Sequence, residues 1–319
     1  MGSESINLSL NNLYKCWWLF CKGKVVSREI IEFEYYLEDN LRRLQVDLIS
    51  GNYRHGDYRQ FEVMDNKRRL IKVAPVRDRV VHRLLYEYLK PIFDKIFIYD
   101  VWSCRENKGL IGAIRRSQEF MRQKPVGYIW RSDIKKFFDN VDNGLLFEII
   151  KRRIKDIKAL EIIKIIIFCQ KSNSAIGIPI GNLTSQIFAN IYLNEFDRFV
   201  KHNLKIKRYL RYGDDFIVLA DNNLELEKIQ AQARKFLKYK LRLEVNTHRD
   251  ILIKVNRGLK FLGAVIYPHS RQLNRRNTKC LFKLLDLGNI SSYSGLVKQY
   301  EPKKLLELNY IILELLNKI

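Results

Sequence analysis

Glycine, proline and long apolar runs are scarce in this sequence of 319 residues. It has 15 Gly and 6 Pro while 47% of its residues are hydrophobic, which excludes a disordered or low-complexity chain. The longest apolar runs, at 17–21 and 165–169, are far shorter than the ~20 residues of a membrane-spanning helix. The first twelve residues, MGSESINLSLNN, lack the basic-then-apolar pattern of a signal segment. We therefore expect neither a membrane protein nor a secreted one.

Cysteine pairs are also missing. The five cysteines are odd in number and contain no C-x-x-C pair, so they indicate neither a disulfide framework nor a zinc site; they are Cys16, Cys21, Cys104, Cys169 and Cys280. Free thiols fit a reducing compartment, and we expect a cytoplasmic location.

Acidic residues are few compared with basic ones. The 58 Lys and Arg against 35 Asp and Glu give a net charge of +23, and the excess is spread from end to end. Basic charge held on a folded body most often serves a polyanion, because each neutralised phosphate releases condensed counterions. Charge alone favours a nucleic-acid partner over a merely soluble basic protein or a lipid-surface binder.

The hydrophobic pattern predicts an α+β fold in which a small sheet is backed by helices. Apolar spacing predicts helices over 29–50, 77–90, 145–170, 184–201 and 224–240. Hairpins are predicted over 53–75, turning near Asp65 and Asn66, and over 207–220, with further strands at 126–134, 241–246, 251–255 and 259–267. Gly51 and Pro91 are expected to end helices and Asp142 to begin one.

Three segments carry the chemistry. Asp133 ends an apolar strand in SDIKKFFDNV, Asp214 and Asp215 form the hairpin tip of YGDDF, and GIPIGNLTSQ is a Gly/Pro-containing loop that enters a helix. A carboxylate at a buried strand end costs desolvation, and adjacent carboxylates on a tight turn repel one another. Two Mg²⁺ ions compensate both costs, because hard cations take oxygen ligands and keep positions open for phosphates.

Each segment also has an ordinary structural interpretation. Gly and Asp are common turn residues, Asp133 can simply begin a helix, and paired aromatic residues are usually core. The conjunction of all three segments in this order on a strongly basic chain favours phosphoryl transfer.

These motifs resemble the polymerase motifs of reverse transcriptases. SDIKKFFDNV is similar to the first palm motif, YGDDF to the catalytic hairpin, LRLEVNTHRDILI to the following motif, and GLKFLGAVIYP to the primer-grip hairpin. The resemblance covers roughly residues 50–270. It implies a right-hand polymerase fold with an N-terminal helical extension at 1–52, fingers at 53–125, a palm at 126–268 and a small helical thumb at 269–319. Part of 143–175 is assigned to either palm or fingers. We expect nicking of target DNA and removal of template RNA to come from other proteins.

The resemblance also implies roles for individual residues. Asp133, Asp214 and Asp215 would be catalytic and, with the backbone at Ile134, would hold two Mg²⁺ ions, for which Mn²⁺ can substitute. Phe138 matches the aromatic residue that screens the sugar 2′ position. The nucleotide-binding set is Arg69, Lys72, Phe138, Ile180, Gly181, Gln186 and Arg249, where Arg249 stands in place of the more usual Lys. The nucleic-acid-binding set is Arg77, Arg79, Tyr212 and Lys260.

The loop at 180–186 points to a subfamily. Most reverse transcriptases carry a Gln-Gly pair, three variable residues and Ser-Pro, whereas here Ile180 replaces the Gln and Gln186 replaces the Pro. The IGNLTSQ form resembles the reverse transcriptases of diversity-generating retroelements. That resemblance implies error-prone copying at template adenines. It also implies a structured template RNA, a primer, dNTPs and a basic multimeric accessory variability protein as partners.

Other functions stay open at this point. Reverse transcriptases of phage-defence systems have variable motifs, and group II intron-like enzymes share the fingers pattern but usually keep the Gln-Gly form. A third alternative is a non-catalytic RNA-binding scaffold. The intact carboxylates Asp133, Asp214 and Asp215 argue against a scaffold, because unused buried charges would only cost stability.

Overall fold

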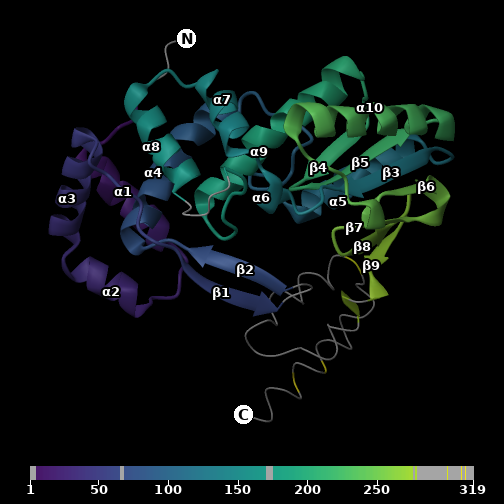
Figure 1. Cartoon of the computed structure of the whole chain (residues 1–319). Coiled ribbons are helices and arrows are strands. Elements are labelled where there is room, and N and C mark those ends of the chain that lie inside the picture. The colour runs from purple at the N-terminus through teal and green to yellow at the C-terminus, as the bar shows by residue number, and fades with distance from the viewer. Residues whose placement is uncertain are drawn as a thin grey trace.

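A computed structural model describes residues 5–64, 68–169, 175–275, 277, 278, 300, 310 and 313 (Figure 1). It shows a mixed structure of helices and antiparallel sheets, as predicted. The turn expected near Asp65 and Asn66 lies outside the described residues, as does most of the thumb expected at 269–319. Within the described ranges, no helix has the length and apolar character needed to cross a membrane.

The N-terminal helices pack beside a long fourth helix. These elements are α1 (Leu10–Cys21), α2 (Arg28–Tyr35), α3 (Leu37–Ser50) and α4 (Val76–Phe93), at the left of Figure 1. The predicted helix over 29–50 is broken at Tyr36, whose φ of −110° and ψ of 34° are not helical. Gly51 ends α3 in the left-handed region at φ 79°, as predicted, because glycine adopts this conformation without steric cost.

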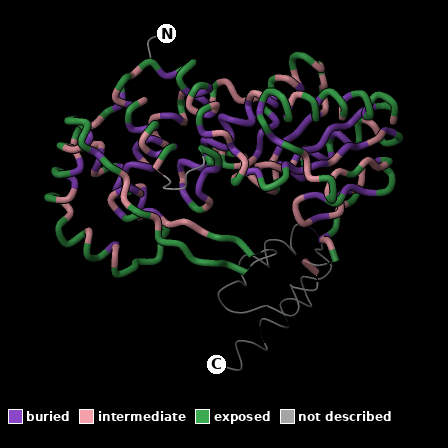
Figure 2. Tube along the Cα trace, in the orientation of Figure 1, coloured by how far each residue is buried: buried purple, intermediate pink, exposed green. Residues whose placement is uncertain are grey.

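A hairpin extends from this helical body. Strands β1 (Arg59–Met64) and β2 (Arg68–Val73) pair antiparallel, and most of their residues are exposed (Figure 2). The prediction that Pro91 ends the following helix is wrong, since α4 continues to Phe93. Leu89 and Phe93 are buried, and their packing holds the last turn although proline removes one backbone hydrogen bond.

The central sheet has the strand order β4-β5-β3-β6 and is antiparallel throughout. Its strands are β3 (Tyr128–Asp133), β4 (Tyr209–Tyr212), β5 (Asp215–Ala220) and β6 (Ile251–Lys254). Helices α9 (Leu183–Arg198) and α10 (Asn223–Leu241) cover one face (Figure 1). Helix α5 (Leu110–Gln123) and a second sheet of β7 (Leu259–Phe261), β8 (Ala264–Ile266) and β9 (Arg271–Leu273) cover the other.

Burial on both faces explains the continuous apolar run of β5. Phe216 and Val218 belong to the core under α9 and α10, whereas Ile217 and Leu219 belong to the core under α5. Successive side chains of a strand point to opposite faces, so a strand between two cores needs apolar residues at every position.

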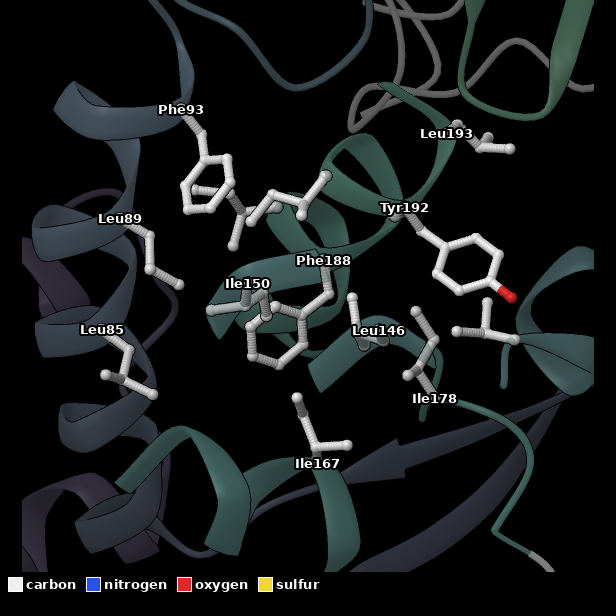
Figure 3. Close-up of a cluster of buried hydrophobic side chains, with 14 of the residues drawn as sticks. Leu85, Leu89, Phe93, Leu146, Ile150, Ile167, Ile178, Phe188, Tyr192 and Leu193 are labelled. Carbon is white, nitrogen blue, oxygen red and sulfur yellow. The ribbon is translucent and has the colours of Figure 1, made fainter. Parts of the chain in front are cut away.

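A helical core supports the loop that precedes α9. Helices α7 (Asn143–Lys151) and α8 (Ile157–Phe168) pack with α4 and α9 around Phe188, with Leu146, Ile150, Ile167 and Ile178 close by (Figure 3). Asp142 caps α7 by accepting a 2.7 Å hydrogen bond from the Leu145 N–H, as predicted. The predicted helix over 145–170 is divided instead, because Asp156 caps a separate α8.

The segment after α10 differs from its prediction. Residues 241–246 were expected to form a strand. They form instead one isolated β-bridge, between Val245 and Ile134. Short helical turns also occur at α6 (Phe137–Asn140), as a π-helix at Phe199–Asn203, and as 3₁₀ turns at Thr247–Arg249 and Val255–Arg257.

Candidate active site

The three predicted carboxylates meet at one end of the central sheet. Asp133 is the last residue of β3 and lies opposite Asp215, the first residue of β5, in the antiparallel register. Asp214 precedes Asp215 in the turn after β4, where Gly213 adopts φ 64°. The hairpin therefore brings together residues that are about eighty positions apart in the chain, in agreement with the sequence prediction.

Desolvation dominates the electrostatics of this cluster. Asp133 is 5% exposed, and its Oδ1, like that of Asp215, is buried without a hydrogen-bond partner among the described residues. Burial, and then the neighbouring charge of Asp214, raise the pKa of Asp215 to about 6. Burial also raises the pKa of Asp214, an effect that Asp133 reinforces and that Arg249 and Arg69 oppose. The cluster is short of positive charge.

Two arginines partly compensate the carboxylates. The Nη1 of Arg249 donates to Oδ2 of Asp133 at 3.0 Å, and the Nη2 of Arg131 lies 3.8 Å from Oδ1 of Asp215. The guanidinium of Arg249 is 42% exposed, so it stands between the carboxylate and solvent. The sequence predicted that Arg249 binds nucleotide, and its ion pair with Asp133 was not predicted.

The donor set fits Mg²⁺. Two buried carboxylate oxygens without partners, on Asp133 and Asp215, are hard ligands of the kind this ion prefers. Among the described residues, no group of three or more His, Cys, Asp or Glu side chains forms a metal site by itself. Mg²⁺ is commonly held by one or two carboxylates together with substrate phosphates, so nucleotide oxygens would complete the coordination. Ile134, the predicted backbone ligand, is 2% exposed.

A pocket of about 230 Å³ is lined by residues of α6, of strand β2 in the β1–β2 hairpin, and of the loop before α9. Phe138, Lys72 and Ile180 line it together, so the structure unites three residues of the predicted nucleotide-binding set. The backbone N–H of Lys72 donates to the carbonyl of Ile180 at 3.0 Å, which ties strand β2 to the loop before α9. This bond fixes the loop relative to the hairpin.

Glycine is required at position 181. Its φ is 110°, and a Cβ there would lie 2.9 Å from Cγ2 of Ile71, closer than real side chains approach. Gln186 lies in the first turn of α9, is exposed and does not line the pocket. At Gly181, the backbone of the loop before α9 therefore packs directly against strand β2.

The remaining predicted residues divide into two groups. Arg69 on β2 is close enough to Asp214 to lower the pKa of that carboxyl, and Tyr212 pairs with Asp215 across the β4–β5 turn. Arg77 and Arg79 instead pair with protein carboxylates, Asp47 at 2.5 Å and Glu29 at 2.9 Å. Lys260 is an exposed residue of β7. The nucleic-acid roles of these residues stay predictions.

Sequence reasoning missed Arg211, which holds the turn that carries Asp214. Its guanidinium is fully buried, donates to both carboxylate oxygens of Asp197 at 2.8 and 2.6 Å, and donates to the carbonyl of Gly213 at 2.9 Å. The available signal was an arginine within an otherwise apolar strand, because a buried cation requires a buried anion. Arg211 therefore anchors the turn to α9.

Comparison with known proteins identifies this arrangement. Residues 60–266 match the model of the family "Reverse transcriptase (RNA-dependent DNA polymerase)", which is well over half of the chain. The chain belongs to the reverse transcriptase family. The matched range of this reverse transcriptase includes β3 and the β4–β5 hairpin, and therefore all three carboxylates.

Relatives come from bacteria and yeast. The reverse transcriptase is 25% identical to Protein YkfC of Escherichia coli over 271 residues, covering 70% of each chain. It is 21% identical to the group II intron-encoded protein LtrA of Lactococcus lactis, covering 72% of this chain and 50% of LtrA. It is 20% identical to the putative COX1/OXI3 intron 2 protein of Saccharomyces cerevisiae, of which it spans 33%. The chain thus spans half or less of these two intron-encoded relatives.

Proposed function

We propose that this reverse transcriptase copies a structured template RNA into DNA with relaxed fidelity, as the polymerase of a diversity-generating retroelement. The observation that carries the proposal is the contact at Ile180 between the 180–186 loop and strand β2 of the β1–β2 hairpin. The main chain of Ile180 is held by Lys72, while its side chain lines the pocket shared with Phe138. An isoleucine side chain makes no hydrogen bond, so a positioning contact that a glutamine would offer is missing.

In the proposed reaction, the primer 3′-oxygen forms a bond to the α-phosphorus of the nucleotide and the bond to pyrophosphate breaks. Asp133 and Asp214 would hold Mg²⁺, which supplies charge neutralisation to the attacking and leaving oxygens. Asp215 would add negative charge at the same end of the sheet, and its Oδ1, which has no hydrogen-bond partner among the described residues, would be a further ligand. Arg249, already beside Asp133, would shift toward the phosphates and stabilise the leaving group electrostatically.

The sugar would be selected by shape. Phe138 presents a ring at the pocket wall, supported by an edge-on contact with Phe137 at a centroid distance of 5.3 Å. The 2′-hydroxyl of a ribonucleotide would clash with this ring, whereas a deoxyribonucleotide has no 2′-hydroxyl and would fit. The proposed product is therefore DNA. Template RNA, primer and dNTPs are the proposed substrates, and a basic multimeric accessory protein is the proposed partner.

A second candidate function is retrohoming of a group II intron-like element. Similarity to LtrA and to the COX1/OXI3 intron 2 protein, both named as intron-encoded, favours it. The two candidate functions predict different error patterns in the cDNA. Only the retroelement function predicts that the 180–186 loop checks base pairs less strictly and that errors concentrate at template adenines.

Sequencing of cDNA made by the purified enzyme on its cognate RNA tests the proposal. We expect substitutions concentrated at template adenines, and Ile180→Gln should lower them by very roughly three- to tenfold, since one restored hydrogen bond contributes ~0.5–1.5 kcal/mol. Ile176→Gln is the matched control, because Ile176 lines the same pocket but is 49% exposed. An error rate that is uniform over the four template bases, or an equal loss of synthesis at each base in Ile180→Gln, contradicts the fidelity role.

A further inference from the structure

A second pocket, of about 440 Å³, lies at the opposite end of α9 from the nucleotide loop. It is bounded by the end of α4, by α7, by the last turns of α9 with the π-helix that follows, and by α10. Asn194 comes eleven positions after Leu183, which places this pocket about 16 Å along the helix axis from the loop. Its volume suits a ligand of mononucleotide size.

An unpartnered amide lines this pocket. Asn194 is 3% exposed, and its Oδ1 has no hydrogen-bond partner among the described residues. Buried polar atoms in folded proteins nearly always have partners, and an amide offers both a donor and an acceptor. This donor and acceptor pair matches the edge of a nucleobase.

The rim of the pocket is cationic. Arg152 pairs with Glu195 at 3.3 Å, whereas Arg153 and Arg198 make no ion pair within the part of the chain that the structure describes. These guanidiniums and one carboxylate leave a surplus of positive charge around a buried polar group. Guanidinium groups bind phosphate through paired N–H donors.

The wall of the pocket is aromatic. Phe199 of the π-helix stacks on Phe236 of α10, with a centroid distance of 4.2 Å and an interplanar angle of 14°. Both residues are partly exposed and line the pocket, which offers a planar base an aromatic surface on which to stack. Stacking of this kind tolerates any base, whereas the amide contact discriminates among them.

The geometry points to a second nucleotide site, which takes one unpaired nucleoside phosphate. The base stacks on Phe199, its edge pairs with Asn194, and the phosphate lies between Arg153 and Arg198. This chemistry has two sources, an unstacked nucleotide of a bound RNA strand or a free mononucleotide. The site is separate from the polymerase carboxylates and does not depend on the proposed retroelement function.

Binding measurements on the full chain test this site with two probes, AMP and an unstructured uridine 12-mer RNA. Arg198→Glu should weaken binding of at least one probe by about tenfold, and Arg198→Lys should restore most of it. Lys228→Glu is the matched control, because Lys228 is an exposed cation of α10 outside the pocket, and it should change affinity less than twofold. For RNA, loss of one phosphate contact should also reduce the slope of log K against log salt by about 0.7.

The pattern of losses identifies the source. A loss for RNA alone assigns the pocket to a nucleotide of the bound strand, and a loss for AMP alone assigns it to a free nucleotide. Asn194→Leu should reduce the preference between AMP and UMP while far-ultraviolet circular dichroism stays unchanged. Arg153→Glu, an exposed substitution, gives a second measurement if Asn194→Leu does not fold. Unchanged affinity for both probes in Arg198→Glu and Arg153→Glu, relative to Lys228→Glu, overturns the proposal.

Discussion

Arg249 donates a 3.0 Å hydrogen bond from Nη1 to Oδ2 of Asp133, which leaves Oδ1 as the buried oxygen without a partner. One oxygen of the predicted metal ligand is thus already bound to a cation of the protein itself. Metal and guanidinium compete for the same carboxylate, because both neutralise its charge. A divalent ion that binds here must displace Arg249 or share Asp133 with it.

Arg249→Met should therefore tighten metal binding while it slows nucleotide incorporation. A partly exposed ion pair contributes about 1 kcal/mol, so we expect Mn²⁺ affinity to rise roughly fivefold. Titration of Mn²⁺ followed by electron paramagnetic resonance measures binding without turnover. Arg257→Met is the control, because Arg257 is an exposed arginine of the next 3₁₀ turn. Weaker Mn²⁺ binding in Arg249→Met would show that the arginine supports the metal site.

Asp214→Asn should abolish nucleotide incorporation and leave RNA affinity nearly unchanged. The substitution removes a charge proposed to bind Mg²⁺, and RNA binding is expected to depend on phosphate contacts elsewhere. We expect activity to fall by at least about a hundredfold, or ~2.7 kcal/mol of transition-state stabilisation. Asp221→Asn is the control and should retain activity. Asp221 is an exposed carboxylate that follows β5, at the opposite end of that strand from Asp214, and it pairs with Lys124. Residual synthesis above about one part in a hundred argues against Asp214 as a metal ligand.

Phe138→Ala should admit ribonucleotides, because it opens the pocket wall at the proposed 2′ position. Single-nucleotide kinetics with dNTP and rNTP pairs measure the discrimination ratio, which we expect to fall by about tenfold or more, in the range of one lost steric contact. Phe168→Ala removes an aromatic ring that is 41% exposed on α8, and it should leave the ratio unchanged. Unchanged discrimination in an active Phe138→Ala enzyme would mean that another group screens the sugar.

Arg211→Met should destabilise the protein by about 3–5 kcal/mol, because it leaves the Asp197 carboxylate buried without its cation. The hydroxyl of Tyr209 donates to the same carboxylate at 2.6 Å and cannot replace a charge. Urea denaturation measures the loss, and the double variant with Asp197→Asn should recover part of it. Arg208→Met, which loses one bond to Gln123, is the control. Equal destabilisation by both arginine variants would contradict the anchoring role.

A buried histidine pair links the segment before β1 and helix α4 to helix α9. His82 is 1% exposed, its Nε2 lies 3.1 Å from Nε2 of His55, and its Nδ1 lies 3.4 Å from the hydroxyl of Thr184. The Nδ1 of His55 donates to the carbonyl of Gly56 at 2.6 Å, and a hydrogen bond joins the two Nε2 atoms. Burial, and then His55, lower the pKa of His82 to about 3.

The free energy of unfolding should fall as the pH drops below about 6.5. Between that value and the folded pKa of about 3, the unfolded chain binds a proton at His82 that the folded chain does not. The expected loss is about 2 kcal/mol at pH 5. Asp215, with its pKa raised to about 6, acts in the opposite direction, so the difference between wild type and His82→Gln isolates the histidine. His202→Gln, at an exposed histidine, should follow the wild-type curve, and His82→Gln should be flatter.

Local signals predicted the elements that position the carboxylates. The apolar runs around Asp133 and the Asp214–Asp215 turn predicted β3 and the β4–β5 hairpin, and the structure places all three residues together. Asp142 as a cap and Gly51 as a stop were also correct, because both act within one helical turn of their own position. Predictions of this kind need no knowledge of distant contacts.

Errors arose where tertiary packing decides the outcome. Pro91 was expected to end α4, but buried neighbours hold the helix for a further turn. The ion pairs of Arg249 with Asp133 and of Arg211 with Asp197 join residues far apart or on different elements, so spacing alone does not reveal them. The carboxylate partners of Arg77 and Arg79 come from helices α3 and α2, which the sequence did not place beside α4.

The two cores on either side of the central sheet also oppose a shift in the register between β3 and β5, on which the position of the carboxylates depends. A slip of β5 by one residue against β3 would exchange Phe216 and Val218 with Ile217 and Leu219 between cores of different shape, and would separate Asp215 from Asp133. Insertions or deletions within these strands would therefore be lost as folding failures before they could yield an enzyme with displaced carboxylates. Strand β1 and the first half of β2 are exposed and carry no such penalty, so the β1–β2 hairpin is free to change in length while the register between β3 and β5 stays fixed.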